Sequence, residues 1–306
     1  MKSEEKDVAI IIINYNSSEF TLDCVDSILS QTSQKLSYQI IIVDNASKPE
    51  EILKLNELKD SPLIEILYSK VNLGFGGGNI LGAEKASARY LFFLNNDCIL
   101  LNDCLGMLND FCNHNPATGL CGAQLYSEEY ERISSFNYLP TPALKFLGPG
   151  FLRLFDPQRY PNRQQHYKAP LKVDLVSGSG LFFRYKAFKE IGGFDPNLFF
   201  YCEEEDLSLR LRKMGWDVYF IPGAKYIHFG GGSSSENLVM LKEYYISLMY
   251  FFRKHYSAVP YFFLRLLYAV KFLRKSLKNG KYFPYVGFLL RGAPMKYSLR
   301  YRECED

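Results

Sequence analysis

The sequence begins its first apolar segment with VAIIII at residues 8–13 and ends it at NYNS, residues 14–17. Five of these six apolar residues are β-branched, which is typical of a strand that is buried on both faces of a parallel sheet. A helix is expected next, because Ser17 or Ser18 can cap it and Leu22, Val25 and Ile28 then recur at three-residue steps. The segment is therefore predicted to be a β–α unit whose strand ends in polar residues.

Two later segments repeat this arrangement. QIIIV at residues 39–43 runs into DNAS, and YLFFL at residues 90–94 runs into NND, with a further strand expected near residues 64–68. Strands that alternate with helices predict an α/β fold with a doubly wound, mostly parallel, Rossmann-like sheet. Ligands bind beyond the carboxyl ends of such strands. One polar strand end is ordinary turn chemistry, but three on one edge predict a binding crevice.

Composition describes a folded chain with an uneven charge. The 306 residues are 47% apolar and 23% charged, with a net charge of only +3, so the whole molecule is not an electrostatic nucleic-acid binder. Residues 251–306 nevertheless carry 12 Lys and Arg against 3 Asp and Glu, a net charge of +9. The first 250 residues therefore have a net charge of −6. Nucleic-acid binding by the basic tail is disfavoured, because no recognisable binding motif accompanies the charge.

The basic tail contains an amphipathic pattern. Apolar side chains recur at three- and four-residue steps over residues 262–278, and basic side chains fall on the opposite side of the same predicted helix. This pattern is typical of a helix that lies in an anionic membrane interface. The alternative is a helix packed against the protein with a solvated basic face. The apolar residues are Phe262, Leu266, Val270, Leu273 and Leu277, and the basic residues are Lys271, Arg274, Lys275 and Lys278.

Cysteine usage and apolar segment lengths suggest a compartment. The seven cysteines form no CxxC pair, so buried free thiols in a reducing cytosol are favoured over a zinc site or disulfides. No signal peptide is expected before the first strand. The longest candidate for a spanning segment, residues 261–270, is interrupted by Arg265 and is shorter than the roughly 18 residues required. We expect a cytoplasmic protein, peripheral on the cytoplasmic face of the inner membrane.

Two polar groups at predicted strand ends suit a divalent cation. Asp97 follows the strand at residues 90–94, and His228 ends a short strand before a glycine run. A carboxylate suits Mg²⁺ or Mn²⁺, and an imidazole favours manganese or another transition ion. Each residue alone has an ordinary structural explanation, as a helix cap or a strand-end histidine. Together on one edge, they predict a metal site.

A glycine-rich segment and an acidic run are the other candidates. NLGFGGGN at residues 72–79 opens the helix predicted before the strand at residues 90–94. It lacks the spacing of a dinucleotide fingerprint, so we expect a flexible turn there whose backbone and asparagines face a nucleotide. EEED at residues 203–206 begins a predicted helix, where acidic residues interact favourably with the helix dipole. The aromatic residues just before this run would raise the pKa of a nearby carboxylate towards the range of a general base.

These motifs together resemble the family-2 glycosyltransferases with the GT-A fold, in particular the bacterial rhamnosyltransferase-like branch. They occur in the order of that family and cover roughly residues 7–255, with Asn95 at the position of the first aspartate of the family's DxD motif. The matching segments are IINYNS (12–17), VDNAS (43–47), NLGF (72–75), LNND (94–97), GGFD (192–195), EEEDLSLRLR (203–212) and IHFGGGS (227–233).

The resemblance implies roles for individual residues. It implies metal ligands at Asp97 and His228 and a general base at Glu204, with Glu203 as an alternative base and Asp206 as a weaker one. The nucleotide-binding residues that it and the strand-end pattern suggest are Asn14, Asn16, Asp44, Asn72, Gly74, Asn79 and Asn96.

The implied activity is inverting transfer of a sugar from dTDP-rhamnose or a UDP-hexose. The acceptor is expected to be a glycan or a polyprenyl-diphosphate-linked glycan in cell-surface polysaccharide synthesis, with Mn²⁺ or Mg²⁺ as cofactor. Residues 1–235 are expected to form the GT-A domain, with 126–172 as a variable acceptor-side insertion, and 236–306 a helical, membrane-associating extension. Two alternatives stay open: a sugar-nucleotide pyrophosphorylase, and a catalytically silent glycan- or membrane-binding module.

Overall fold

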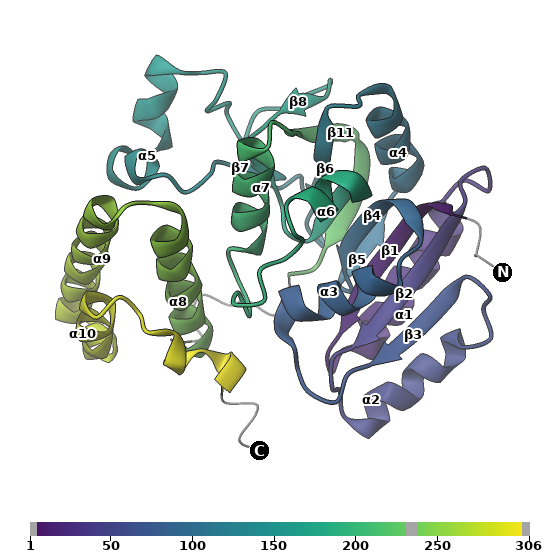
Figure 1. The fold of residues 1–306 in the computed structure, drawn as a ribbon, viewed down its shortest axis with the longest axis horizontal. Helices are drawn as coiled ribbons and strands as arrows, with labels where there is room; N and C mark the ends of the chain where they lie inside the picture. The colour runs from purple at the N-terminus through teal and green to yellow at the C-terminus, as the bar shows by residue number, and fades with distance from the viewer. Residues whose placement is uncertain (1–4, 231–237, 302–306) are drawn as a thin grey trace.

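The computed structural model describes residues 5–230 and 238–301, which form an α/β body and a group of C-terminal helices (Figure 1). The body contains a nine-stranded sheet with the order β3-β2-β1-β4-β10-β6-β11-β5, and β8 pairs with β11 beside this path. Its strands are β1 (Lys6–Asn14), β2 (Tyr38–Asp44), β3 (Ile64–Tyr68), β4 (Ala88–Asn95), β5 (Cys98–Leu100), β6 (Thr118–Tyr126), β8 (Leu171–Lys172), β10 (Gly180–Arg184) and β11 (Asp217–His228). A separate two-stranded sheet pairs β7 (Phe136–Asn137) with β9 (Leu175–Val176).

Helices cover both faces of the large sheet, and the alternation of side chains along the strands decides which helix each residue meets. In β1, Ile10 and Ile12 belong to the core shared with α1 and α4, whereas Ala9 and Ile11 belong to the core shared with α3, α6 and α7. Both sets are fully buried, which explains the continuous apolar run. The helices of the body are α1 (Ser18–Gln31), α2 (Pro49–Lys54), α3 (Gly74–Lys85), α4 (Cys104–His114), α5 (Pro142–Phe155), α6 (Tyr185–Glu190) and α7 (Glu203–Lys213).

The register of the first strands brings their polar ends together. β1 pairs in parallel with β2 and β4, so that Asn14 lies opposite Asp44 and Ile13 lies opposite Asn95. The predicted α/β fold with a mostly parallel sheet is confirmed, and its polar strand ends share one edge.

The second half of the sheet differs from the expectation. β10 runs antiparallel between β4 and β6, and neither β10 nor β6 is predicted by the β–α alternation. The short strand expected before His228 is the end of a longer strand, β11, whose pairing with β6 shifts register between Ile221 and Lys225. Residues 222–224 therefore form a bulge-like irregularity within β11, and the strand continues past them.

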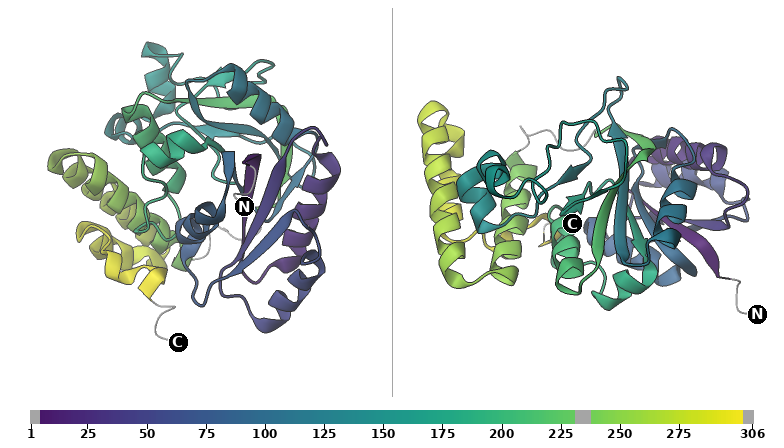
Figure 2. Two further views of the ribbon diagram at one scale, coloured as in Figure 1. Left: turned by 45° about the vertical axis from the view of Figure 1, so that its right-hand side comes forward. Right: turned by 90° about the horizontal axis from the view of Figure 1, so that it is seen from above.

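The C-terminal helices have their own apolar core. α8 (Leu238–His255), α9 (Ala258–Lys278) and α10 (Phe283–Leu290) bury a cluster that also takes in Leu198 and Cys202 from the body. Figure 2 shows these helices beside α7, at the end of the molecule away from β3. None of the helices in the described ranges is long and apolar enough to cross a bilayer.

Candidate active site

Asn14, the last residue of β1, is the centre of a buried network at the strand ends. Its side-chain nitrogen lies 2.9 Å from Asp44 Oδ2 and 3.1 and 3.2 Å from the hydroxyls of Ser18 and Ser47, while its oxygen accepts a hydrogen bond from Thr21 Oγ1 (2.8 Å). The other Asp44 oxygen accepts the backbone N–H of Ser47 (3.0 Å). Asn14 and Asp44 are fully buried. In this structure they hold the ends of β1 and β2 together. They were expected to face a nucleotide, but their side chains are closed off from the surface.

Two other asparagines shape the loops around this network. Asn96 donates to Ser17 Oγ (2.8 Å) and Thr21 Oγ1 (3.0 Å), which ties the end of β4 to the start of α1. Asn16 has a left-handed backbone (φ 52°), and its side-chain oxygen accepts the backbone N–H of Lys48 (2.8 Å). Both therefore order loops that border the strand ends, and the Asn16 residue is exposed there.

Asp97 and His228 lie together at the same edge. His228 ends β11, which pairs antiparallel with β5, and its Nε2 lies 3.3 Å from Asp97 Oδ1. The backbone N–H of Gly230 donates to Asp97 Oδ2 (3.1 Å). Burial alone would raise the pKa of Asp97, but the hydrogen bond and charge of His228 outweigh it and lower that pKa. Asp97 is therefore held as a carboxylate, with its side chain 19% exposed and that of His228 23% exposed.

These donors fit a hard divalent cation. Asp97, His228 and Cys98 offer ligand atoms that all lie within 4.8 Å of one another. The Cys98 sulfur, however, donates to the backbone oxygen of Ser179 (3.6 Å), and burial raises the pKa of this thiol well above its usual value. Asn95 Oδ1 is buried beside the pair and has no hydrogen-bond partner within the described residues. The Asp97 carboxylate and the His228 imidazole are therefore the suitable ligands. The uncharged side-chain oxygen of Asn95 lies close to them.

Glu204, in the first turn of α7, reaches the same edge of the sheet. A methyl group built on Gly178 would lie 3.2 Å from Glu204 Cδ, so this carboxyl packs directly against the turn before β10. The next residue of that turn, Ser179, accepts the backbone N–H of Asn95 (2.9 Å) and the Cys98 thiol. Glu204 therefore contacts Gly178, and the neighbouring Ser179 is hydrogen-bonded to Asn95 and Cys98, which flank Asp97 in sequence.

The acidic run divides between different environments. Glu203 is 5% exposed, its Oε1 has no hydrogen-bond partner within the described residues, and burial with the charge of Glu204 raises its pKa well above the usual range. Burial also raises the pKa of Glu204, whose carboxylate is hydrogen-bonded by Glu205. Glu204 stays partly exposed and Glu203 does not. Of the two candidate bases, Glu204 is the one that an acceptor could reach.

The glycine-rich segment opens a helix as expected, but residues 74–79 lie within the helix and do not form the expected flexible turn. Residues 74–85 form α3, with Gly74 at its start in a left-handed conformation (φ 73°). A Cβ there would lie 2.3 Å from the backbone oxygen of Phe199, so only glycine fits. Asn72 accepts from the Asn45 amide (2.9 Å) and stays half-buried at the edge. Asn79 is 1% exposed and donates to Phe75 O inside the helix, so it does not face a nucleotide.

A network that the sequence analysis missed holds the acidic run in place. Asp206 is fully buried and accepts hydrogen bonds from Arg210 in α7 and from Lys254 and His255 at the end of α8. Lys254 also donates to Asp195 (2.7 Å). The GGFD motif containing Asp195 was the only sequence signal for this role. Asp206, the weaker candidate base, therefore has a structural role. Through Lys254 and His255, α8 helps to hold α7 in position.

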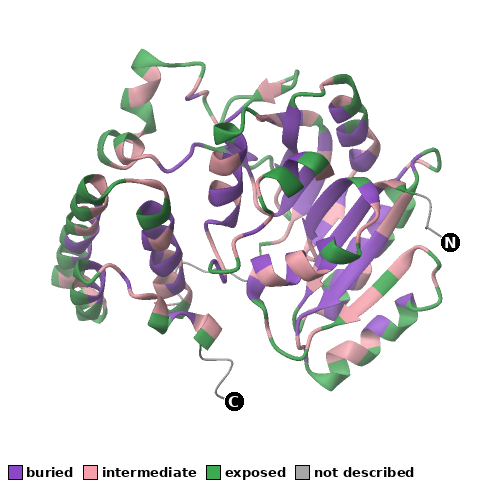
Figure 3. Ribbon diagram, in the orientation of Figure 1, coloured by how far each residue is buried: buried purple, intermediate pink, exposed green. Residues whose placement is uncertain are grey.

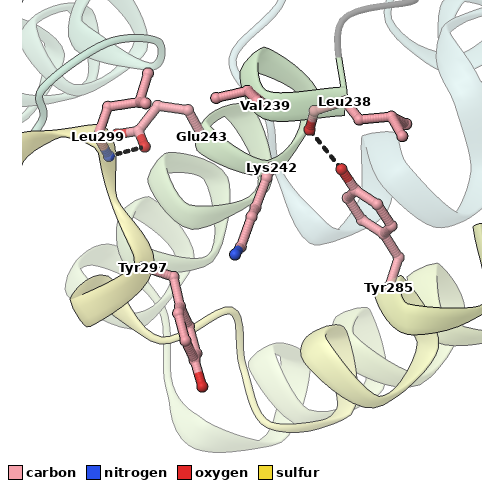
Figure 4. A pocket seen from close by; sticks show the side chains of 7 residues that line it. All are labelled: Leu238, Val239, Lys242, Glu243, Tyr285, Tyr297 and Leu299. Atoms are coloured by element: carbon pink, nitrogen blue, oxygen red, sulfur yellow. Dashed lines mark hydrogen bonds between the residues drawn. The ribbon is translucent and has the colours of Figure 1, made fainter. Parts of the chain in front are cut away.

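A cavity of about 170 Å³ lies elsewhere, between α8, α10 and the C-terminal turns (Figure 4). Its polar lining is engaged by protein: Glu243 accepts the backbone N–H of Leu299 (2.9 Å), Tyr285 donates to the Leu238 oxygen, and Lys242 lies 4.5 Å from the Tyr297 ring centre. The cavity is separate from the strand ends. Residues 231–233 of the predicted IHFGGGS motif lie outside the described residues.

The chain is similar to several known glycosyltransferases. The rhamnosyltransferase WbbL of Escherichia coli is 25% identical over 231 residues, which are 72% of this chain and 83% of the relative. The N-acetylglucosaminyl-diphospho-decaprenol L-rhamnosyltransferase of Mycobacterium tuberculosis is 40% identical over 65 residues, 21% of each chain. The crystal structure of GalNAc-T7 with UDP, GalNAc and Mn²⁺ superposes with a TM-score of 0.59 at 18% identity, covering 85% of this chain and 52% of that one.

Family models cover most of the described chain. The model for glycosyl transferase family 2 matches residues 9–192, which is more than half of the chain and includes the strand ends, Asp97 and the turn at Gly178. The model for glycosyl transferase family group 2 matches residues 163–294, which include Glu204 and His228. The expected resemblance is confirmed: the chain is a glycosyltransferase and belongs to glycosyl transferase family 2.

Proposed function

We propose that the protein transfers a sugar, with inversion, from dTDP-rhamnose or a UDP-hexose to a glycan or polyprenyl-diphosphate-linked glycan in cell-surface polysaccharide synthesis. The relatives support this proposal, since two are named rhamnosyltransferases and a third, of Myxococcus xanthus, is named O-antigen biosynthesis protein RfbC. The observation that carries it is the Asp97–His228 pair on the sheet edge that Glu204 also approaches.

The chain's own residues supply one base and a site for a cation. Glu204 takes the proton of an acceptor hydroxyl, whose oxygen bonds to the anomeric carbon as the bond to the departing nucleoside diphosphate breaks on the opposite face. This single displacement inverts the anomeric centre and requires no protein nucleophile. Asp97 and His228 would hold Mn²⁺ or Mg²⁺, which neutralises charge on the diphosphate when bound. Burial raises the pKa of Glu204, which suits a general base.

The location at a membrane is also part of the proposal. The stripe Phe262, Leu266, Val270, Leu273 and Leu277 is exposed, with the five residues 37–82% accessible. α9 packs on the protein through its other face, as the alternative expects, and the exposure of this stripe supports a second contact with a membrane. We place the protein as peripheral on the cytoplasmic face of a membrane, where a lipid-linked acceptor would lie.

Calorimetric titration with UDP and dTDP, with and without Mn²⁺, tests the proposal, followed by a donor screen that measures release of free nucleotide. We expect metal-dependent binding of one nucleotide, weakened at least about tenfold by Asp97→Ala and retained in Cys98→Ala. Turnover of a nucleotide sugar would reject the silent binding module. Nucleotide binding that is independent of metal and unchanged in Asp97→Ala would contradict the assigned site. Membership in family 2 already favours transfer over a pyrophosphorylase.

A further inference from the structure

Exposed large apolar side chains are concentrated on three helices. Figure 3 shows that much of the ribbon of these helices is exposed. The described residues contain 28 such side chains, and half of them belong to α5, α9 and α10, which together have 43 residues. The rest are distributed over the other elements. A concentration of this kind on a folded protein indicates a surface that is covered in use. The α5 and α9 members are Phe146, Leu147, Phe151, Leu154, Phe155, Val259, Phe262, Phe263, Leu266, Val270, Leu273 and Leu277.

α9 presents two apolar faces. Leu264, Tyr268 and Phe272, spaced by four residues, are buried in the core shared with α8 and α10. The stripe that includes Leu266 and Val270 lies on the remaining surface and stays accessible. One face is therefore fully explained by packing, and the other is not.

α5 adds a second apolar surface beside α9. None of its residues is buried, and Leu154 and Phe155 in its last turn are 79% and 74% exposed. Gly148 (φ 80°) and Pro149 break the helix into two short segments. α5 contacts α9, and Figures 1 and 2 show both helices at the end of the molecule opposite β3. A short, kinked helix with no buried side chain gains little from packing, so its apolar content calls for another partner.

The charge on these two helices decides between partners. α5 and α9 contain seven Lys and Arg residues and no Asp or Glu. Two copies of the chain that faced each other through this surface would bring like charges together. An anionic lipid bilayer would meet both the apolar side chains and the positive charge.

We propose that α5 and α9 form a single docking surface for an anionic lipid bilayer, with α5 as a second anchor beside the basic tail. This deepens the proposed function, on which it rests for the lipid-linked nature of the acceptor. α5 lies within residues 126–172, so the insertion faces the bilayer directly. The docking surface is the set of twelve exposed apolar residues of α5 and α9 given above.

The test is cosedimentation with vesicles of neutral phosphatidylcholine alone or with 30% phosphatidylglycerol. The α5 variant is Leu154→Asp with Phe155→Asp, and the α9 variant is Leu273→Asp with Leu277→Asp; all four side chains are exposed, so the fold should be retained. The matched control is Leu53→Asp on α2, whose side chain is 65% exposed at the far end. We expect the wild type and the control to bind anionic vesicles and each double variant to bind at least about tenfold more weakly.

Wild-type vesicle binding by the α5 variant would overturn the role of α5. A wild-type dimer that the α5 variant dissociates, measured by sedimentation velocity, would show that a second copy covers the surface and would also overturn the proposal. Nucleotide binding measured in parallel separates these results from a failure of the proposed function, because it does not require lipid.

A second measurement reports insertion directly. The chain has one tryptophan, Trp216, so a Trp216→Phe background allows Phe155→Trp to serve as a single reporter in α5. We expect its emission to shift to shorter wavelength with anionic vesicles and to be quenched by brominated lipid. An emission unchanged by bound vesicles would contradict insertion of α5.

Discussion

At the scale of the residue, Glu204 is the most informative position of the site. Its carboxyl lies against Gly178, where no side chain can come between it and the sheet edge. Burial raises the pKa of Glu204 above its usual value. A carboxylate with a raised pKa is a stronger base, yet it can still be ionised near neutral pH.

Glu204→Gln should lower kcat by about 10² to 10⁴, because the amide cannot accept the proton of the acceptor hydroxyl. Nucleotide binding should stay within about twofold, since the substitution changes neither Asp97 nor His228. Steady-state kinetics and calorimetry measure the two effects. The exposed Glu57→Gln serves as a control for loss of one carboxylate, and undiminished turnover in Glu204→Gln would reject Glu204 as the base.

The pH profile of the wild type follows from the same carboxyl. The base acts in its ionised form, so kcat/KM should fall as the pH drops through the raised pKa of Glu204, at a higher pH than for an ordinary glutamate. An acidic limb at the usual glutamate pKa would mean that a solvated carboxylate is the base.

At the scale of the element, α7 depends on α8 for its position. Asp206 receives Lys254 Nζ and His255 Nε2, each at 2.6 Å, and Arg210 Nε at 2.8 Å. Burial alone would raise the pKa of Asp206, but the His255 hydrogen bond and the charge of Arg210 outweigh it and lower this pKa to about 2. These contacts hold the first turn of α7, and with it Glu204, against the body.

Asp206→Asn should reduce the free energy of unfolding by about 3 kcal/mol, because it leaves the mostly buried Arg210 without its anion and Lys254 with Asp195 alone. Urea denaturation measures this loss, with Asp60→Asn, an exposed aspartate, as the control. In the wild type, the Asp206 carboxylate should contribute about 2 kcal/mol above its unfolded pKa of about 4, and this contribution should be lost as the pH falls towards 2. Equal stability of the two variants would show that the network adds nothing.

Gly74 tests how closely α3 approaches the segment before the acidic run. Gly74→Ala should destabilise the protein by about 2 kcal/mol or more, because alanine disfavours the left-handed backbone and its Cβ would overlap the Phe199 oxygen. Gly150→Ala is the matched control, since a Cβ at Gly150 meets no atom within 4 Å. Thermal unfolding of both variants measures the difference, and similar midpoints would argue against a strained contact.

Local pattern accounts for some elements and not for others. The β-branched run in β1 predicts its strand, because both faces of a central strand are apolar and the signal is continuous. β10 is short, begins in a glycine turn and runs antiparallel, so the β–α alternation carries no information about it. α9 has apolar side chains on two of its faces, so the sequence pattern alone does not identify the face that packs against the protein. Only the packing of Tyr268 and Phe272 decides which side meets the core.

At the scale of the whole molecule, the site combines segments that are distant in the chain. Asp97 and His228 are brought together by antiparallel pairing of β5 with β11, and Glu204 by the packing of α7 on the turn before β10. The strand-end rule predicts that polar residues share one edge. It does not predict that Asn14 and Asp44 use their polar atoms on each other, because such pairing depends on rotamers inside a closed network. The contact of His255 with Asp206 has no local sequence signal either.

The docking surface predicts how the enzyme should respond to the form of its acceptor. An acceptor anchored in anionic vesicles is concentrated at the surface where α5 and α9 hold the enzyme, so attachment raises its effective concentration. Leu154→Asp with Phe155→Asp should therefore raise KM at least about tenfold for an acceptor in anionic vesicles, and should leave kcat/KM within about twofold for a short-chain acceptor free in water. Leu53→Asp should change neither value, and added salt should reduce the advantage of the vesicle-bound acceptor in the wild type. Equal losses with both acceptors would mean that α5 acts on the catalytic site and not through the bilayer.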